Sequence, residues 1–365
     1  MKISYWETLK RIEAVNIGEA YVLAGFDAVQ DHLVNVVKHW NEQGDKTLFS
    51  TISEFGSYLC SKAGMSCCIE LKTVTDKIGG NMVILAQALA DLGVRTACVG
   101  TLGDEKSVVY NTLAQFSDVY SLAPYGSCTA LEFKDGKVML ANNSAMYFTW
   151  RDVMDKIGED TLSRLLERCN MLCLLNWAEM ANANEIWRQL LDFAADRGVG
   201  EGKMAFIDLS DFSHRTTVEI ILCAEIIKDY GKHFRLTLGL NENEARHFAK
   251  AFQLRTESIE GIGRELLGRT GVETLVIHTN TYAYAFDKDG AVFEGPAFIC
   301  TNPRTLTGGG DNFNAGFCLG KLLNLGSDAC VLLGNACSGY YVRNGKSTDF
   351  DSMKAFIKSY LCGKD

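Results

Sequence analysis

The chain has 365 residues, of which 47% are hydrophobic and 22% are charged, and its formal net charge is −9. This is ordinary globular composition, so collagen-like, coiled-coil and mainly disordered architectures are excluded. The acidic balance argues against a broad basic surface for nucleic acid. A site for an anionic ligand must therefore be built locally, from backbone N–H groups, a few basic side chains or a metal.

The 13 cysteines lack the paired spacing that a metal cluster or a disulfide framework needs. We expect them to be small buried hydrophobic residues in a reducing compartment. The N-terminal stretch MKISYWETLK has no apolar region of a secretory signal, and no apolar run approaches the roughly 18 residues of a transmembrane helix. The prediction is a cytoplasmic protein that binds neither nucleic acid nor membrane.

Only three prolines occur, and no linker, charge block or repeat divides the chain, so we expect a single domain over residues 1–365. Short apolar runs predict strands at Tyr21–Phe26, Arg95–Gly100, Met171–Leu175, Met204–Leu209, Leu236–Leu240 and Thr274–His278. Helices are expected at Asn81–Leu92, Asp160–Arg168, Asn184–Arg197, Thr217–Tyr230 and Glu257–Arg269. This alternation predicts an α/β fold with a mostly parallel sheet flanked by helices on both faces.

Two segments depart from this alternation. Cys128–Leu140 has alternating residues around a Lys-Asp-Gly turn, which predicts an antiparallel hairpin. Between residues 40 and 77 we expect a helix near Ile52–Lys62 and a strand over Cys68–Val74. Together they predict a small antiparallel β lid, contributed by parts of 40–77 and by 126–142. The exposed edge of such a hairpin would allow a homodimer through the lid.

The strongest local motif is a glycine run and an acid before a helix, formed by Thr307, Gly308, Gly309, Gly310 and Asp311. Glycines let the backbone approach a ligand closely, and a helix N-terminus adds positive potential there. This combination suits a phosphate or the charge that develops in phosphoryl transfer. Asp311 could accept a proton from an attacking hydroxyl. The alternative is a flexible loop in which Asp311 only caps the helix.

A second glycine pair, Gly79-Gly80, precedes Asn81 at the start of a helix, and its amide could bind a polyol hydroxyl. The alternative is a tight turn with an Asn cap. Asp31 lies just beyond the first predicted strand, where a carboxylate faces the ligand crevice of an open α/β sheet. It could bind two sugar hydroxyls or be a solvated surface residue. Asp27 is a competing candidate.

Asn241 and Glu244 stand three residues apart after the predicted strand Leu236–Leu240. This spacing is typical of a capping box, with Asn as N-cap and Glu at the third helical position. The functional alternative places Glu244 near a hydrated Mg²⁺ beside phosphates.

Along the chain the order is the acid Asp31, the Gly79–Asn81 turn, the pair Asn241 and Glu244, and the glycine run with Asp311. In this order the four motifs resemble those of the ribokinase-like, PfkB-type carbohydrate kinases, over about Tyr21 to Val342. Gly79–Gly103 resembles the first signature of that family, and Thr307–Phe317 resembles the second. The resemblance implies an α/β core with a small β lid. It also implies a Mg²⁺-dependent transfer of a phosphoryl group from ATP to a sugar or related polyol.

The resemblance further implies roles for single residues. Asp311 becomes the catalytic base, and the N–H groups of Gly308, Gly309 and Gly310 become the anion hole. Substrate ligands are expected at Asp31, Gly80 and Asn81. Nucleotide or phosphate contacts are expected at Asn241, Glu244, Thr279, Thr307 and Asn335, with Glu244 next to Mg²⁺ through water.

Three departures from the family pattern leave alternatives open. Thr305-Leu306 replaces the usual Asp-Thr pair of a monovalent-cation loop, and Ile84 replaces an expected asparagine. The nucleotide loop is His278–Tyr282, which is loosely similar to that of ADP-dependent sugar kinases, so ADP is the alternative donor. The remaining alternatives are a nucleoside kinase and a non-catalytic sugar- or nucleotide-binding regulator. The sequence does not identify the phosphate acceptor.

Overall fold

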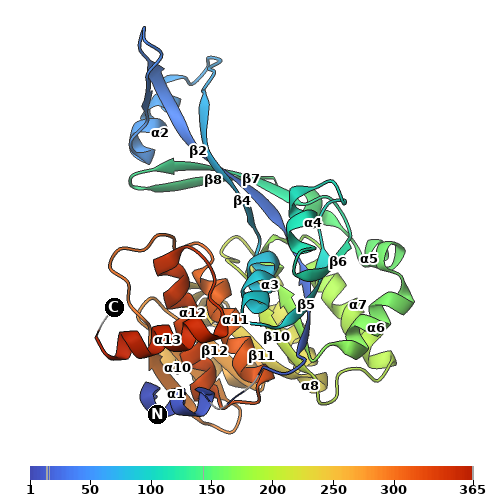
Figure 1. Ribbon diagram of the computed structural model, residues 1–365. Coiled ribbons are helices and arrows are strands. Elements are labelled where there is room, and N and C mark those ends of the chain that lie inside the picture. The colour runs from blue at the N-terminus through green and yellow to red at the C-terminus, as the bar shows by residue number, and fades with distance from the viewer. Residues whose placement is uncertain (14, 16, 143, 364–365) are drawn as a thin grey trace.

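The computed structural model describes residues 1–13, 15, 17–142 and 144–363, so residues 14, 16, 143 and 364–365 of the expected single domain lie outside the described part. Its strands form two sheets (Figure 1). The central sheet consists of β1 (Tyr21–Phe26), β5 (Arg95–Gly100), β6 (Ser117–Ser121), β9 (Met171–Leu175), β10 (Met204–Asp208), β11 (Arg235–Asn241), β12 (Thr274–His278), β13 (Tyr282–Asp287) and β14 (Val292–Pro296).

The strand order in the central sheet is β14-β13-β12-β11-β10-β9-β1-β5-β6. The strands from β12 to β6 in this order run parallel, and β13 and β14 extend the sheet antiparallel. The prediction of a mostly parallel sheet is confirmed, and all six predicted strands are present. The strands β6, β13 and β14 were not predicted, and the nucleotide loop expected over His278–Tyr282 overlaps the first residue of β13.

Helices cover both faces of the central sheet, as predicted. One face carries α5 (Trp150–Ile157), α6 (Glu159–Arg168), α7 (Ala183–Asp196), α8 (Thr217–His233), α9 (Glu242–Ala251) and α10 (Ile259–Thr270). The other carries α1 (Tyr5–Glu13), α3 (Asn81–Asp91), α4 (Val108–Leu113), α11 (Gly309–Leu322), α12 (Ser327–Asn344) and α13 (Phe350–Leu361). Short 3₁₀ turns occur at Ser144–Tyr147 and Trp177–Glu179.

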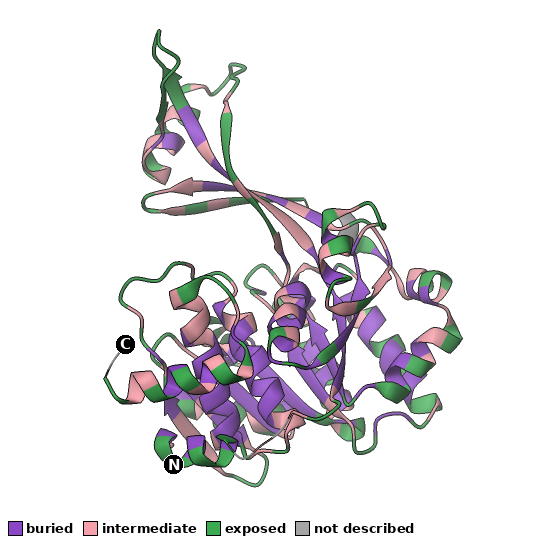
Figure 2. Ribbon diagram, in the orientation of Figure 1, coloured by how far each residue is buried: buried purple, intermediate pink, exposed green. Residues whose placement is uncertain are grey.

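Strand β1 shows why two helical layers are needed. All six of its residues are buried, and successive side chains point to opposite faces of a strand. Tyr21 and Leu23 pack into the cluster of α5 to α10, whereas Val22 and Ala24 pack into the cluster of α3, α11 and α12. Burial is accordingly concentrated in the body of the molecule (Figure 2).

The second sheet is the lid, which projects from the body in Figure 1. It consists of β2 (Val29–Trp40), β3 (Lys46–Leu48), β4 (Leu71–Gly79), β7 (Gly126–Phe133) and β8 (Gly136–Asn142) and is joined by α2 (Ile52–Ser61). The predicted hairpin is confirmed as β7 and β8, which pair antiparallel. The strand predicted over Cys68–Val74 is found a few residues further along the chain, as β4, because β4 pairs with β2 over almost its whole length.

Strand β2 is the main element that the sequence analysis missed. Its burial alternates only weakly, because most of it lies in a thin sheet with one small apolar cluster of its own. That cluster contains Val34, Val36, Phe49, Phe55 and Leu131. Only Asp27 and Ala28 separate β2 from β1, and Gly80 alone separates β4 from α3. The base of the lid is therefore joined directly to the carboxyl edge of the central sheet.

Candidate active site

Polar side chains gather where the parallel strands end. Asp27 directly follows β1, Asn176 directly follows β9, Asp208 is the last residue of β10, and His278 is the last of β12. The carboxyl ends of parallel strands meet at one edge of a sheet, and ligands of open α/β folds bind there. Asp27, Asn176 and Asp208 are nevertheless buried, with at most 6% of the residue surface exposed. They form the floor of this edge.

The predicted glycine loop leads into α11 at this edge. Gly308 is the N-cap, with a φ of 93° in the left-handed region, and a Cβ there would stand 2.7 Å from the Tyr341 hydroxyl oxygen. The N–H of Gly309 donates to the carbonyl of Leu306 at 3.1 Å. The N–H groups of Gly310 and Asp311 belong to the first helical turn, where they have no partner within the helix. This end of α11 can receive an anion.

Asp311 lies in the first turn of α11, and its Oδ1 accepts a hydrogen bond of 3.0 Å from the Asn81 amide nitrogen. The structure thus brings Asp311 and Asn81, which belong to two motifs far apart in the sequence, into contact. Burial raises the pKa of Asp311 well above its usual range, and the nearby carboxylates of Asp208 and Asp27 raise it further. The bond from Asn81 acts in the opposite direction. A carboxyl group with a raised pKa is suited to accept a proton.

Gly80 and Asn81 form the start of α3, as predicted. Gly80 has a φ of 101°, and a Cβ there would stand 2.9 Å from Asp27 Oδ2 and 3.0 Å from the Cα of Ala28. A side chain at this position therefore meets both a forbidden backbone conformation and a clash. The N–H groups of Asn81 and Met82 donate to the two Asp27 oxygens, at 2.7 and 2.9 Å.

Asp31 lies in a different place from the one expected. It is part of β2 in the lid, in register with Lys77 and Cys128, and it is Asp27 that stands at the end of β1. We expected Asp31 in the crevice just beyond the first central strand, but the chain passes into β2 two residues after β1 ends, so Asp31 belongs to the lid. Asp31 is half-buried, and burial raises its pKa. A Cβ on Gly79 would stand 2.7 Å from its Oδ2, so Asp31 lies beside the Gly79–Asn81 loop.

Asn241 and Glu244 form a complete capping box at the start of α9. The Glu244 N–H donates to Asn241 Oδ1 at 2.9 Å, and the Asn241 N–H donates to Glu244 Oε2 at 2.9 Å. The Asn241 amide nitrogen also donates to Glu244 Oε1 at 2.6 Å. Glu244 is only 3% exposed, and burial, followed by the charge of Asp208, raises its pKa well above its usual range. The capping role is therefore confirmed; the metal role stays a prediction.

A hollow of about 520 Å³ brings Asn241 and Thr279 together with His278 and Arg246. The Thr279 hydroxyl is engaged locally, since it accepts from the N–H groups of Thr281 and Tyr282 at 3.2 and 3.1 Å. Burial lowers the pKa of His278 to about 4, so its ring is neutral at ordinary pH. The hollow thus offers several neutral polar groups and one cationic group, Arg246, which is paired with Glu242 of the same lining at 2.7 Å.

Thr307 and Asn335 have contacts within the protein. The Thr307 side chain is exposed, and its carbonyl accepts a 3.1 Å hydrogen bond from the Tyr341 hydroxyl. Asn335 is 4% exposed in α12, and its amide nitrogen donates to the Tyr5 hydroxyl at 2.8 Å and to the Gly295 carbonyl at 3.2 Å. Asn335 therefore ties α12 to α1 and β14. Its contact with a nucleotide stays a prediction.

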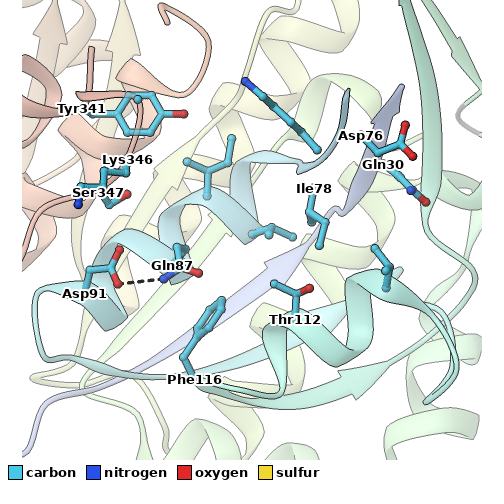
Figure 3. Close-up of a pocket in the computed structure, with 15 residues that line it drawn as sticks. Gln30, Asp76, Ile78, Gln87, Asp91, Thr112, Phe116, Tyr341, Lys346 and Ser347 are labelled. Carbon is cyan, nitrogen blue, oxygen red and sulfur yellow. Dashed lines mark hydrogen bonds between the residues drawn. The ribbon is translucent and has the colours of Figure 1, made fainter. Parts of the chain in front are cut away.

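A larger groove, of about 670 Å³, runs along α3 (Figure 3). Gln30 and Asp76 line it at the base of the lid, and Tyr341 lines it on the side of α12. Ile84, the residue at the position of the expected asparagine, is part of its wall. Its lining does not include Asp311, so this groove adjoins the site residues but is not where they meet.

Sequence reasoning missed Asp208, Asn176 and Asn314. The Asn314 amide nitrogen donates to Asp208 Oδ2 at 2.7 Å, and the Asn176 amide nitrogen donates to Asp27 Oδ2 at 2.9 Å. A signal was available, because Asn176 and Asp208 stand at the ends of two predicted strands. That is the position at which we singled out Asp31.

A sequence model of the prokaryotic ketohexokinase family matches residues 8–360 of the chain. The chain belongs to this family. It is a carbohydrate kinase, a phosphotransferase with an alcohol group as acceptor, as the motifs predicted. A curated relative, the ketohexokinase of Haloferax volcanii, is 24% identical over 343 residues, which are 93% of this chain and 91% of the relative.

Solved structures of similar fold confirm the ribokinase-like architecture of the kinase. Adenosine kinase from Sinorhizobium meliloti is 16% identical, with a TM-score of 0.66, and the match covers 94% of this chain and 99% of that one. A putative ribokinase II from E. coli, in complex with ATP and Mg²⁺, is 12% identical with a TM-score of 0.65, over 93% and 99% of the two chains. Arabidopsis thaliana ribokinase, complexed with ribose and ATP, is 14% identical with a TM-score of 0.62, over 94% and 99%.

The donor atoms at the carboxyl edge fit a hydrated Mg²⁺ held mainly by a nucleotide. Among the described residues, no group of three or more His, Cys, Asp or Glu side chains is placed to hold a metal ion. Mg²⁺ usually keeps several waters and binds one or two carboxylates together with substrate phosphates. Glu244 could supply such a carboxylate through water. Separately, no described helix combines the length and the apolar character that crossing a membrane requires.

Proposed function

We propose that this kinase transfers the terminal phosphoryl group of ATP to a ketohexose, with Asp311 as general base and Mg²⁺ bound beside the phosphates. The observation that carries the proposal is the position of Asp311. It lies in the first turn of α11, at a helix end open to an anion, and it contacts Asn81 at the start of α3. A hydroxyl placed there meets a proton acceptor and the transferring group at the same time.

The acceptor class rests on the family and on polar groups beside Asp311. The curated relative is named a ketohexokinase, and a ketohexose has several hydroxyls to be bound. Asp31 in the lid and the Gly80–Asn81 turn are the groups we assign to those hydroxyls. Because β2 and β4 connect directly to this edge, the lid can cover a bound sugar and exclude water, which would limit wasteful hydrolysis of the nucleotide.

The donor and the metal are proposed on the fit of the site. Two of the structures of similar fold contain ATP, one of them with Mg²⁺. We assign the nucleotide to the hollow at Asn241 and Thr279, with Thr307 and Asn335 near its path. Its phosphates would lie at the N-terminus of α11, over Gly308, Gly309 and Gly310. Mg²⁺ would neutralise developing charge there, with Glu244 orienting its water shell.

Within this arrangement the chain performs three tasks. Asp311 removes the proton from the acceptor hydroxyl as the oxygen attacks the phosphorus. The first-turn N–H groups of α11 stabilise the negative charge of the transferring group. The capping box of Asn241 and Glu244 fixes the start of α9 next to the phosphates.

A coupled phosphotransfer assay of D-fructose, other ketohexoses, D-ribose and adenosine, each with ATP or ADP and Mg²⁺, tests the proposal. We expect turnover with a ketohexose and ATP, and ³¹P NMR of the product identifies the phosphorylated oxygen. ADP as the better donor would overturn the choice of nucleotide, and adenosine as the best acceptor would favour a nucleoside kinase. Ligand binding without transfer on the whole panel would favour a regulator.

The Asp311→Asn variant tests the base. It should lower kcat by about 10²–10⁴-fold and leave nucleotide affinity nearly unchanged. Asp287→Asn is the matched control, because Asp287 accepts from the hydroxyls of Thr274 and Ser327 at the opposite edge of the sheet, at 2.7 and 2.8 Å. Wild-type turnover in Asp311→Asn would contradict the mechanism.

We also propose that two copies pair through their lids. The strands β4 and β8 each pair with one strand among the described residues, and exposed apolar side chains lie on them: Leu71, Val74, Met139 and Leu140. Exposed strand edges of this kind invite pairing with another chain. Sedimentation velocity should show a dimer that Leu140→Lys weakens. A monomer at micromolar concentration would contradict this proposal.

A further inference from the structure

A closed circuit of hydrogen bonds underlies the catalytic edge. It joins two glycine-led helices to the ends of β1, β9 and β10. We call it the polar ring; its members are Asp27, Asn81, Asn176, Asp208, Asn314 and Asp311. Five of its links are hydrogen bonds, and α11 supplies the sixth because it carries both Asn314 and Asp311.

The first half of the polar ring runs from Asp311 to Asp27. The Asn81 side chain donates to Asp311 Oδ1 at 3.0 Å, while the N–H of the same residue donates to Asp27 Oδ2 at 2.7 Å. Asp27 Oδ1 accepts from the N–H of Met82 at 2.9 Å. Asp27 therefore fixes the position and direction of the first residue of α3. The Asn81 side chain starts from that fixed backbone.

The second half runs from Asp27 back to α11. The Asn176 amide nitrogen donates to Asp27 Oδ2 at 2.9 Å, and the Asn176 N–H donates to the Asp208 carbonyl at 3.0 Å. Asn176 has a φ of 55°, a conformation that few residues other than glycine adopt. The Asn314 amide nitrogen then donates to Asp208 Oδ2 at 2.7 Å, one turn after Asp311.

Burying the polar groups of this ring costs free energy, and a role in the site would explain why they are buried. Asp27, Asn176, Asp208 and Asn314 are buried, and the charge of Asp27 adds to burial in raising the pKa of Asp208. Burial of charged groups costs free energy even when they are hydrogen-bonded, and apolar residues would fill the same space at lower cost. Hydrogen-bonded polar networks, however, hold side chains in one arrangement. In this one each amide nitrogen of Asn176 and Asn314 is bonded, whereas their Oδ1 atoms are buried without a partner. The group that the polar ring holds at the catalytic edge is the Asp311 carboxylate.

We propose that Asp27 is a positioning residue of the kinase: it sets the start of α3 so that Asn81 holds Asp311 Oδ1 and leaves Oδ2 to take the proton of the acceptor hydroxyl. This inference rests on the proposed role of Asp311 as base. Asp27 itself touches no reacting atom. The sequence analysis considered it as a ligand of the sugar, and its contacts with the three donors of Asn81, Met82 and Asn176 assign it to the protein instead.

The test is a double-mutant cycle with Asp27→Asn and Asn81→Ala. Asp27→Asn keeps the volume but turns an NH₂ group toward N–H donors, so α3 shifts at its first residue. We expect kcat to fall by about 10–100-fold, with KM for both substrates changed less than about threefold, because misplacement by about 1 Å costs this much. Asp287→Asn serves as the control for the same chemical change at the opposite edge.

The decisive readout is the same substitution in the Asn81→Ala background. If Asp27 acts through the Asn81 side chain, Asp27→Asn lowers kcat there by less than about twofold, because the link to Asp311 is already absent. An equal loss in both backgrounds overturns the proposal, and so does a loss of thermal stability like that of Asp287→Asn with unchanged kcat. If Asp27→Asn does not fold, Asn176→Ala, which removes one donor to Asp27, takes its place in the cycle.

A second readout keeps this inference separate from the proposed function. The ¹⁵N–¹H signal of the Asn81 side-chain amide, assigned by its loss in Asn81→Ala, should exchange slowly with solvent in the wild type. It should exchange at least about tenfold faster in Asp27→Asn, and an unchanged rate overturns the inference. This measurement needs no turnover. Failure of the acceptor panel or of Asp311→Asn therefore counts against the proposed function alone.

Discussion

The N-termini of α3 and α11 lie at the same edge of the sheet, yet their first N–H groups differ in whether a carboxylate of the protein occupies them. Each follows a glycine with a positive φ, Gly80 at 101° and Gly308 at 93°. At α3 the N–H groups of the first two residues are taken by the Asp27 carboxylate. At α11 no carboxylate from elsewhere in the described part of the chain accepts from the N–H groups of Gly310 and Asp311. An internal anion thus satisfies one helix end, and the other can receive an external one.

This difference shows what decides whether a glycine-led helix binds phosphate. The two motifs are similar in sequence, since glycines precede a polar residue and an apolar helix in both. The deciding group is Asp27, far from either motif in the chain. A helix N-terminus is therefore a binding site only where the fold brings no carboxylate of its own to it.

The largest expected effect comes from adding a methyl group at each of the two ends. Gly80→Ala should destabilise the protein by about 2–4 kcal/mol, because its Cβ meets Asp27 and Ala28 in a backbone conformation unsuited to alanine. Gly310→Ala should change stability by less than about 1 kcal/mol, since its Cβ stands 3.4 Å from the His278 ring in ordinary contact. Denaturant unfolding measures both.

Kinetics should reverse this order. The added methyl of Gly310→Ala lies where we place the phosphates, so kcat/KM for ATP should fall although the protein is stable. Equal losses of stability in the two variants would contradict the distinction between a filled and an open helix end.

Much of this architecture could be predicted from local patterns. Apolar runs gave six of the seven parallel strands, all but β6, because both faces of that sheet are covered, and the glycine and capping signals gave the starts of α3, α9 and α11. Strand β2 could not be found in this way, since it pairs along its length in the thin, exposed lid. The missed β2 is also why Asp31 was placed at the wrong strand end.

The candidate site was predicted less completely, for a physical reason. Asp311 and Asn81 carry recognisable motifs, but their contact joins positions 230 residues apart. The partners below them, Asp208 and Asn314, are single polar residues in buried surroundings. Only the register of β9, β10 and β1 brings Asn176 and Asp208 beside Asp27. Such a network becomes visible only when the sheet is assembled.

The buried carboxylates beneath the two helix ends should make stability depend on pH, and Asp208 is the clearest case. Burial raises the pKa of Asp208, and the nearby Asp27 raises it further, although bonds from the Ser210 N–H and Asn314 oppose the shift. The folded state therefore binds this proton more tightly than the unfolded state. The resulting stability is complete below the unfolded value near 4 and is lost as pH rises through the folded pKa.

Asp208→Asn should remove part of this dependence. The orphaned Oδ1 of Asn314 can accept from the new amide if the Asn314 side chain turns over, so the hydrogen bond is kept and only the charge is lost. The midpoint of urea unfolding should fall as pH rises above about 4 in the wild type, and fall less in the variant. Parallel curves for the two proteins would show that the buried charge of Asp208 carries no cost.

The smallest expected effect concerns the loop that leads into the open end. The Tyr341 hydroxyl donates to the Thr307 carbonyl at 3.1 Å and lies against Gly308. Tyr341→Phe removes this partly exposed bond, which should cost about 0.5–1 kcal/mol or less. Tyr360→Phe removes a similar bond, from the Ile299 N–H at 3.2 Å, at a distance from the glycine loop. We expect that the loop before α11 must be held in place for its N–H groups to meet phosphate. Tyr341→Phe should therefore raise KM for ATP by about two- to threefold, which corresponds to a loss of this size. The control Tyr360→Phe should leave KM for ATP unchanged. Equal KM values for the two variants would mean that the open end of α11 is held by the helix alone.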